Sequence, residues 1–144
     1  MKLTSQQFKK IGFYITLFAM IGFISYVLVF KAAYVPFGYN VISHDKTTVE
    51  LQSTSIFGKK KSETVTFTKE DEWIEEILMD AVKRQKEQYW FLFTVIPFSL
   101  WILVNYIWKG KGIWKGVIRS SIIFSILVSI LPLWHTISFI RVLI

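Results

Sequence analysis

Three long runs of apolar residues set the pattern of this sequence. The first run covers residues 11–30 and contains no charged residue, whereas Lys9 and Lys10 precede it and Lys31 follows it. At about 1.5 Å per helical residue, such a run covers roughly 30 Å, the thickness of a bilayer's hydrocarbon core. A cleaved signal peptide would have a shorter apolar core and a small-residue cleavage site. We therefore predict a basic N-terminal tail over 1–10 and an uncleaved transmembrane helix over 11–30.

The second apolar run covers residues 89–108 and has aromatic side chains at both ends. Trp90 lies near its start and Trp108 at its end, where tryptophan is typical of the two membrane–water interfaces. Pro97 in the middle frees a backbone carbonyl, which membrane helices tolerate when a neighbouring group bonds to it. We predict a second transmembrane helix over 89–108. The side chains that we expect to act as interface anchors are Trp90, Trp108, Trp114 and Trp134.

The third apolar run covers residues 117–140. Ser121, Ser125 and Ser129 recur at intervals of four residues within it, so they share one face of a helix. Small residues at this spacing let two membrane helices approach closely. We predict that this serine face packs against another span, with Asn105 of the second run bonding between helices. The alternative is that the same four residues line a polar pore.

The segment between the first two runs, residues 31–88, has a different composition. Alternating apolar and polar residues predict strands near 39–43, 47–53 and 63–67, with His44–Lys46 as a turn between the first two. These strands would form a small antiparallel meander of two or three strands. The segment is too short to bury a substantial core by itself.

An amphipathic helix is predicted at the end of that segment. Thr68 is a typical N-cap residue, and the acidic side chains of Glu70, Asp71 and Glu72 would fill the first helical turn. An apolar stripe at helical spacing follows, made of Trp73, Ile74, Ile77, Leu78 and Ala81. We favour packing of this stripe on the meander, and the alternative is a docking surface for another protein. This helix and the second span can form one continuous helix, because no helix-breaking residue separates them.

Composition supports a membrane protein. Hydrophobic residues make up 53% of the 144 residues and the mean hydropathy is +0.44, more apolar surface than a small soluble domain can bury. The fold class predicted is therefore a mainly α membrane protein: three transmembrane helices, with a small β-meander plus amphipathic helix between the first and second. Residues 141–144 would form a C-terminal tail.

The distribution of charge along the chain distinguishes a membrane protein from a nucleic-acid-binding protein and predicts the orientation in the membrane. The net charge is +7, but all ten acidic residues lie between Asp45 and Glu87, and the remaining basic residues flank the apolar runs. This pattern is typical of membrane anchoring, so no nucleic-acid partner is expected. The short loop 109–116 is basic and acid-free, which places it and the N-terminus in the cytoplasm and residues 31–88 outside. The nine basic residues of the long segment favour the reverse orientation, although segments of that length depend less on charge.

The sequence contains little that could perform chemistry. It has no cysteine, and the three apolar runs contain no Asp or Glu, which argues against thiol, carboxylate-relay and carboxylate-metal chemistry. Two histidines on separate segments make a zinc site improbable. We interpret His135, next to Trp134, as an interfacial residue. A third helix that began at Ser120 or Ser121 would move His135 inward and strengthen the alternative of a buried relay. No enzyme activity and no cofactor are expected.

Two functional hypotheses remain. The first is a non-enzymatic protein of a bacterial cell membrane that acts by contact, as an accessory, regulatory or self-protection protein. Its partners would be the lipid bilayer and another membrane protein or a second copy of the chain. The alternative is a subunit of an oligomeric pore or small transporter.

Overall fold

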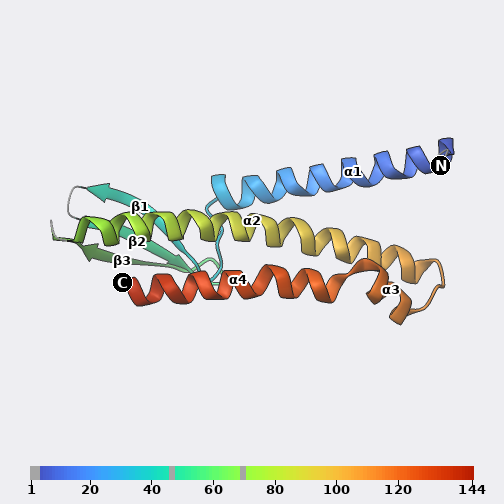
Figure 1. Ribbon diagram of the computed structural model, residues 1–144. Helices are drawn as coiled ribbons and strands as arrows, with labels where there is room; N and C mark the ends of the chain where they lie inside the picture. Colours follow the sequence, from blue (N-terminus) through green and yellow to red (C-terminus); the bar gives the residue numbers. More distant parts are fainter. Residues whose placement is uncertain (1–3, 46–47, 69–70) are drawn as a thin grey trace.

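The computed structural model describes residues 4–45, 48–68 and 71–144, and one long helix organises them (Figure 1). Two other helices pack along this helix, and a small sheet lies at the end where the C-terminus is found, with the N-terminus at the opposite end. Three helices are long and apolar enough to cross a membrane, by length and composition. The elements are α1 Ser5–Tyr26, the π-helical turn η1 Val27–Lys31, β1 Tyr39–Asp45, β2 Thr48–Thr54, β3 Lys60–Thr66, α2 Glu72–Trp108, α3 Ile113–Ser120 and α4 Ile122–Leu143.

The first helix begins earlier than the apolar run. α1 starts at Ser5, where the side chain of Gln7 accepts a hydrogen bond from the backbone N–H of Thr4 at 2.9 Å. This bond satisfies an N–H group that no helical carbonyl reaches. The helix continues through η1 to Lys31, and the chain then turns at Ala33, whose φ is 52°.

The amphipathic helix and the second apolar run form one continuous helix, α2. Its 37 residues extend over about 55 Å, far more than a bilayer core requires. The prediction that Thr68 caps this helix is wrong, because α2 begins at Glu72 with Asp71 in the N-cap position. The Thr68 hydroxyl instead donates to Asp71 Oδ2 at 2.5 Å, before the helix starts. Glu70 lies outside the described residues.

The predicted start of the third helix near Val117 is also wrong. Ser121 adopts a left-handed conformation with φ of 52° and separates α3 from α4. α3 takes up the second half of the expected loop, and Gly116 places it close to α2. A Cβ atom at Gly116 would lie 3.0 Å from Leu103 Cδ1, so a small residue permits this approach. The helix that continues to the C-terminus therefore begins at Ile122.

The sheet is an antiparallel meander in the order β1–β2–β3, as the alternating pattern predicted. The prediction that His44 and Asp45 form a turn is wrong. His44 pairs with Val49 and Asp45 pairs with Thr48, so both residues belong to β1. Lys46 of the predicted turn lies outside the described residues. A bulge between Val41 and Ser43 shifts the register within β1, which the alternating pattern does not reveal.

One buried core joins the sheet to two helices. Val49 and Leu51 of β2 meet Leu78 of α2, and all three are fully buried. The same cluster includes the last turns of α4, which contribute Leu133, Ile137 and Ile140. Leu78 and Ala81 of the apolar stripe of α2 belong to this core, in agreement with the favoured packing on the meander for that part of the stripe, and α4 contributes to a core that residues 31–88 were expected to be too short to form alone. We call the sheet, the first turns of α2 and the last turns of α4 the head.

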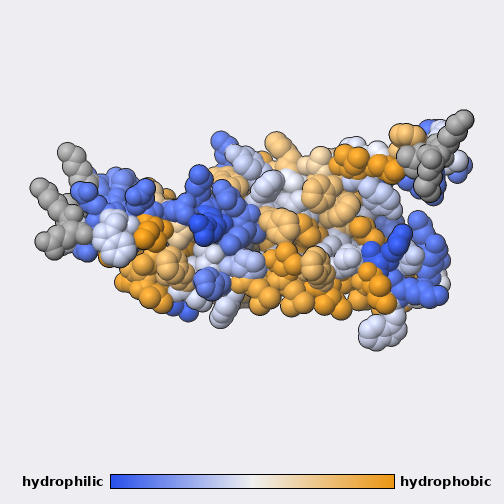
Figure 2. All heavy atoms as spheres, in the orientation of Figure 1, coloured by the Kyte–Doolittle hydropathy of each residue, from blue (hydrophilic) through white to orange (hydrophobic). Residues whose placement is uncertain are grey.

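The distribution of side chains on the surface follows this arrangement. Figure 2 shows apolar residues gathered over the helices between the basic turn at one end and the polar sheet at the other. The basic residues Lys109, Lys111 and Lys115 lie around the turn that joins α2 to α3. An apolar middle with polar ends is the surface that a bilayer would cover.

Candidate functional site

A clamp between the start of β1 and α2 fixes the head on the long helix. The Tyr39 N–H donates to Gln85 Oε1 and Gln85 Nε2 donates to the Tyr39 carbonyl, both at 3.1 Å. Gln85 is fully buried, so these two bonds satisfy an amide that would otherwise be costly to bury. The Tyr89 hydroxyl donates to the carbonyl of Pro36 one helical turn further on.

Gly38 makes this clamp possible. A Cβ atom at this position would lie 2.5 Å from Gln85 Nε2 and 3.0 Å from Tyr89 Cε2. Both distances are shorter than ordinary van der Waals contact, so a larger residue requires the Gln85 side chain to shift out of the clamp. Gly38 also ends a β-turn that begins at Val35, closed by a hydrogen bond from the Gly38 N–H to the Val35 carbonyl at 2.9 Å, with Pro36 in the second position. The proline and the glycine are typical of such a turn, but this pattern does not reveal the contact with Gln85.

A groove opens between α2 and α4 on the head, and we call it the head groove. It has a volume of about 620 Å³. α2 lines one wall and the C-terminal turns of α4 line the other. The lining residues are Trp73, Glu76, Ile77, Asp80, Ala81 and Arg84 of α2, and His135, Thr136 and Phe139 of α4.

The predicted partner surface, Trp73 to Ala81, is divided between the core and this groove. Leu78 is fully buried and Ala81 is 6% exposed, while Ile74 packs against the edge of the core. Trp73 and Ile77 remain 62% and 37% exposed. Only these last two can meet another molecule without unfolding the head.

Charges around the groove are of both signs. Arg84 donates to Asp80 Oδ2 at 3.1 Å across one turn of α2. On the other side of the head, His44 of β1 bonds to Glu75 and ties the sheet to α2. Among the described residues, Glu76 forms no ion pair, so it leaves an unneutralised carboxylate at the groove. The mouth is therefore suited to an apolar group that carries a positive charge.

A second exposed ion pair lies on the sheet, away from the groove. Lys61 donates to Glu63 Oε1 at 2.8 Å, and this hydrogen bond raises the pKa of Lys61 above its ordinary value. Because the lysine is fully exposed, the pair contributes little to stability.

The residues of the predicted serine face do not stay together. Ser125 is buried and its Oγ lies 2.8 Å from Ser99 Oγ of α2, and Ser129 is buried against α2 one turn further on. Ser121 is exposed at the break between α3 and α4. The prediction that Asn105 bonds between helices is wrong, because its Nδ2 donates to the Trp101 carbonyl of its own helix at 2.9 Å.

Two further hydrogen bonds join α1 to α2 within the apolar part of the helices. Ser25 Oγ lies 2.8 Å from the carbonyl of Phe93, which is the carbonyl that Pro97 deprives of its helical donor. Trp90 Nε1 donates to the Gly22 carbonyl at 2.9 Å. The expected interface anchor Trp90 is therefore also a helix–helix contact.

The other expected interface anchors lie at the surface. Trp108, Trp114 and Trp134 are all largely exposed, the first two near the basic turn and the third toward the head. His135, next to Trp134, is exposed and lines the head groove, so the later start of α4 does not bury it. Within the described ranges, no three His, Cys, Asp or Glu side chains are grouped to hold a metal ion.

No protein-family model matches this chain, and no curated protein and no solved structure shows a significant match to it.

Proposed function

We propose that this chain is a three-span protein of a bacterial cell membrane that acts by contact with another membrane protein. The head would present the head groove to its partner. The observation that carries this proposal is that Trp73 and Ile77 stay exposed at the rim of a groove, although the rest of their apolar stripe is buried. Exposed apolar side chains that rim a groove in the aqueous part of a protein are typical of an interaction site.

The chemistry of the groove indicates which partner segment would fit. Trp73, Ile77 and Phe139 offer apolar contacts, while Glu76 supplies a carboxylate without an ion-pair partner among the described residues. A juxtamembrane segment with apolar side chains and a neighbouring Lys or Arg would complement both features.

Photo-crosslinking in native membranes tests this proposal. A benzophenone side chain at Ile77 should capture one partner in stoichiometric amounts, and Trp73→Ala should reduce the yield because an aromatic anchor is lost. The matched control is a benzophenone at Ile42, which is exposed on β1 and does not line the groove. Equal capture from Ile77 and Ile42, or a chain that crosslinks only to lipid, would count against the proposal.

Orientation belongs to the same proposal. We expect the N-terminus and the basic turn in the cytoplasm and the head outside, because the turn carries lysines and no acid. Single cysteines at Lys60 and Gly112 can be introduced into this cysteine-free chain. An impermeant maleimide added to intact cells should label the cysteine at Lys60 and spare the one at Gly112. The opposite labelling pattern would reverse the orientation.

A further inference from the structure

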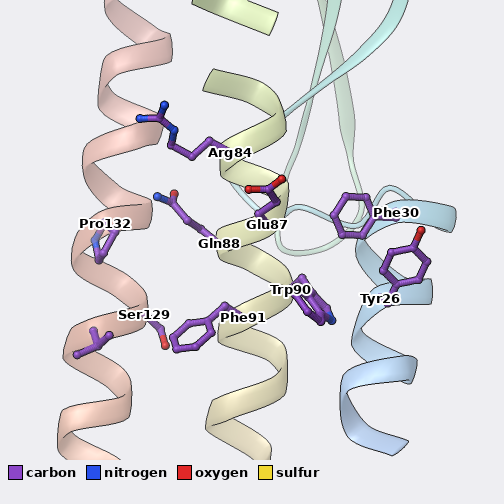
Figure 3. A pocket seen from close by; sticks show the side chains of 10 residues that line it. Tyr26, Phe30, Arg84, Glu87, Gln88, Trp90, Phe91, Ser129 and Pro132 are labelled. Carbon is purple, nitrogen blue, oxygen red and sulfur yellow. The ribbon is translucent and has the colours of Figure 1, made fainter. Parts of the chain in front are cut away.

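A second groove runs along the apolar part of the helices, and we call it the lateral groove. Its wider hollow measures about 570 Å³ and adjoins a narrower one of about 310 Å³, and the two share Tyr26, Trp90 and Phe91. The wide hollow lies across α2 between α1 and α4 (Figure 3). We propose that the lateral groove binds one phospholipid whose head group carries both a phosphate and a primary ammonium. This inference rests on the membrane location proposed above, whereas contact with a partner protein plays no part in it.

Polarity changes along the groove in the same order as along a phospholipid. Arg84 and Glu87 stand at one end of the wide hollow, Gln88 follows, and Phe91 lies deeper. At about 1.5 Å per residue, Phe91 is about 10 Å further along α2 than Arg84. A phospholipid likewise passes from a charged head group through ester groups to acyl chains. The groove thus offers charge, hydrogen bonds and apolar surface at matching depths.

The charged end suits a zwitterionic head group. Figure 3 shows Arg84 leaning toward α4 and Glu87 on the side nearer to α1, so opposite charges flank the mouth. Arg84 uses one nitrogen for Asp80, which leaves further N–H donors for a phosphate. Among the described residues, Glu87 has no ion-pair partner and can accept hydrogen bonds from an ammonium group. A choline head group has no N–H to donate, and an anionic head group without an amine leaves the Glu87 carboxylate unpaired.

The middle of the groove holds polar atoms without partners. Within the described residues, Gln88 Oε1 and Ser129 Oγ are buried and form no hydrogen bond. Both line the wide hollow beside Pro132, which has no N–H and therefore leaves the Val128 carbonyl without its helical donor. An unsatisfied polar group is strongly unfavourable in hydrocarbon. The Ser129 hydroxyl can donate to an ester carbonyl of a lipid, whereas Gln88 Oε1 is an acceptor and can bond to a donor such as the head-group ammonium.

The deep end of the groove is almost entirely apolar. Beyond Trp90 and Phe91, the narrower hollow is lined by Phe18, Phe23 and other residues of α1 and α2. Such a surface can pack against an acyl chain, but it presents almost no polar atoms that could bind a polar ligand. Phospholipid is therefore favoured over a soluble phosphate compound, which would bind the mouth alone.

Lipid binding to the purified chain in maltoside micelles tests this inference. Native mass spectrometry should show phosphatidylethanolamine retained about tenfold more tightly than phosphatidylcholine with the same acyl chains, because one charge-assisted hydrogen bond distinguishes them. Glu87→Gln should abolish that preference, and Arg84→Gln should weaken retention of both lipids about tenfold. Soluble glycerophosphoethanolamine, added at the same concentration, should not bind.

Two matched variants provide the controls. Lys83→Gln and Glu72→Gln remove exposed charges of the same signs from α2 residues that do not line the lateral groove, and both should retain lipid as the wild type does. Circular dichroism in lipid-free micelles checks that all four variants keep their helices. Equal retention of the two lipids by the wild type, or equal effects of Lys83→Gln and Arg84→Gln, would overturn the inference. A failure of the crosslinking at Ile77 would leave these lipid measurements unaffected.

Discussion

Replacing Ser25 by alanine removes the hydrogen bond that compensates for Pro97. The Ser25 side chain is buried, and its Oγ lies 2.8 Å from the carbonyls of both Phe93 and Ile21. The single hydroxyl hydrogen of Ser25 is shared between these two carbonyls, and its donation to Phe93 supplies the donor that proline cannot provide. Alanine leaves almost the same volume, so the loss measured would be that of the hydrogen bond rather than of packing.

The magnitude follows from the environment of that carbonyl. Hydrogen bonds between membrane helices contribute on average about 0.6 kcal/mol and at most about 1.7 kcal/mol. The Phe93 carbonyl has lost its helical donor, so we expect Ser25→Ala to cost about 1–1.7 kcal/mol, near the upper end of that range. In a Pro97→Ala background, the backbone N–H restored at that position bonds to the same carbonyl. There, Ser25→Ala should cost less than about 0.5 kcal/mol.

A double-mutant cycle measures this coupling. The purified chain in bicelles would be unfolded by steric trapping, with tryptophan fluorescence as the signal, for the wild type, both single variants and the double variant. Thr16→Ala is the control, because the Thr16 hydroxyl donates to the Gly12 carbonyl of its own helix at 2.9 Å and is exposed. Equal costs of Ser25→Ala in the two backgrounds would refute the idea that Ser25 compensates for Pro97.

Two further predictions concern the head. Gly38→Ala should destabilise the head by about 2 kcal/mol or more, as judged by protease resistance of the sheet, because its Cβ would overlap the Gln85 amide and leave buried polar groups unpaired. Gly12→Ala, where nothing lies within 4 Å, should be neutral or stabilise α1 by up to about 1 kcal/mol, and a loss there would contradict this reasoning. Ile140→Ala should cost about 2–5 kcal/mol in the same assay because Ile140 is fully buried in the core. Val142→Ala, at a position that is 84% exposed, should change stability by less than about 0.5 kcal/mol, and equal losses at the two positions would disprove the packing of α4 on the head.

The features that depend on length and periodicity were predictable from the sequence. Long uncharged runs produce membrane-length helices, and alternation between 48 and 66 produces β2 and β3. Breaks within helices were not predictable in this way. Ser121 adopts a left-handed conformation although serine is not typical of such positions, and no proline or glycine adjoins it. On the N-terminal side of that break α3 packs close to Leu103 of α2, and a contact between two helices leaves no mark in the local sequence pattern.

The candidate site was only partly predictable for a similar reason. Helical periodicity identified the stripe that includes Ile77 and Leu78, but it does not say which neighbour covers each residue. The two lie one position apart, yet Leu78 is fully buried and Ile77 borders the head groove. Ser99 was missed as the partner of Ser125, because a single serine in an apolar run gives no signal of the helix that it will meet. The polar atoms of Gln88 were missed for the same reason.

α4 lies in two different environments along its length. Its first turns carry Ser125 against α2 in the apolar part of the molecule, whereas its last turns contribute Ile137 and Ile140 to the buried cluster that also contains sheet residues. The sequence records part of this difference, because residues 122–132 contain no charged residue whereas residues 133–143 carry His135 and Arg141. The head therefore depends on side chains from a helix that lies outside residues 31–88 in the sequence. It follows that residues 31–88 alone lack the α4 side chains of their core and should not fold in water.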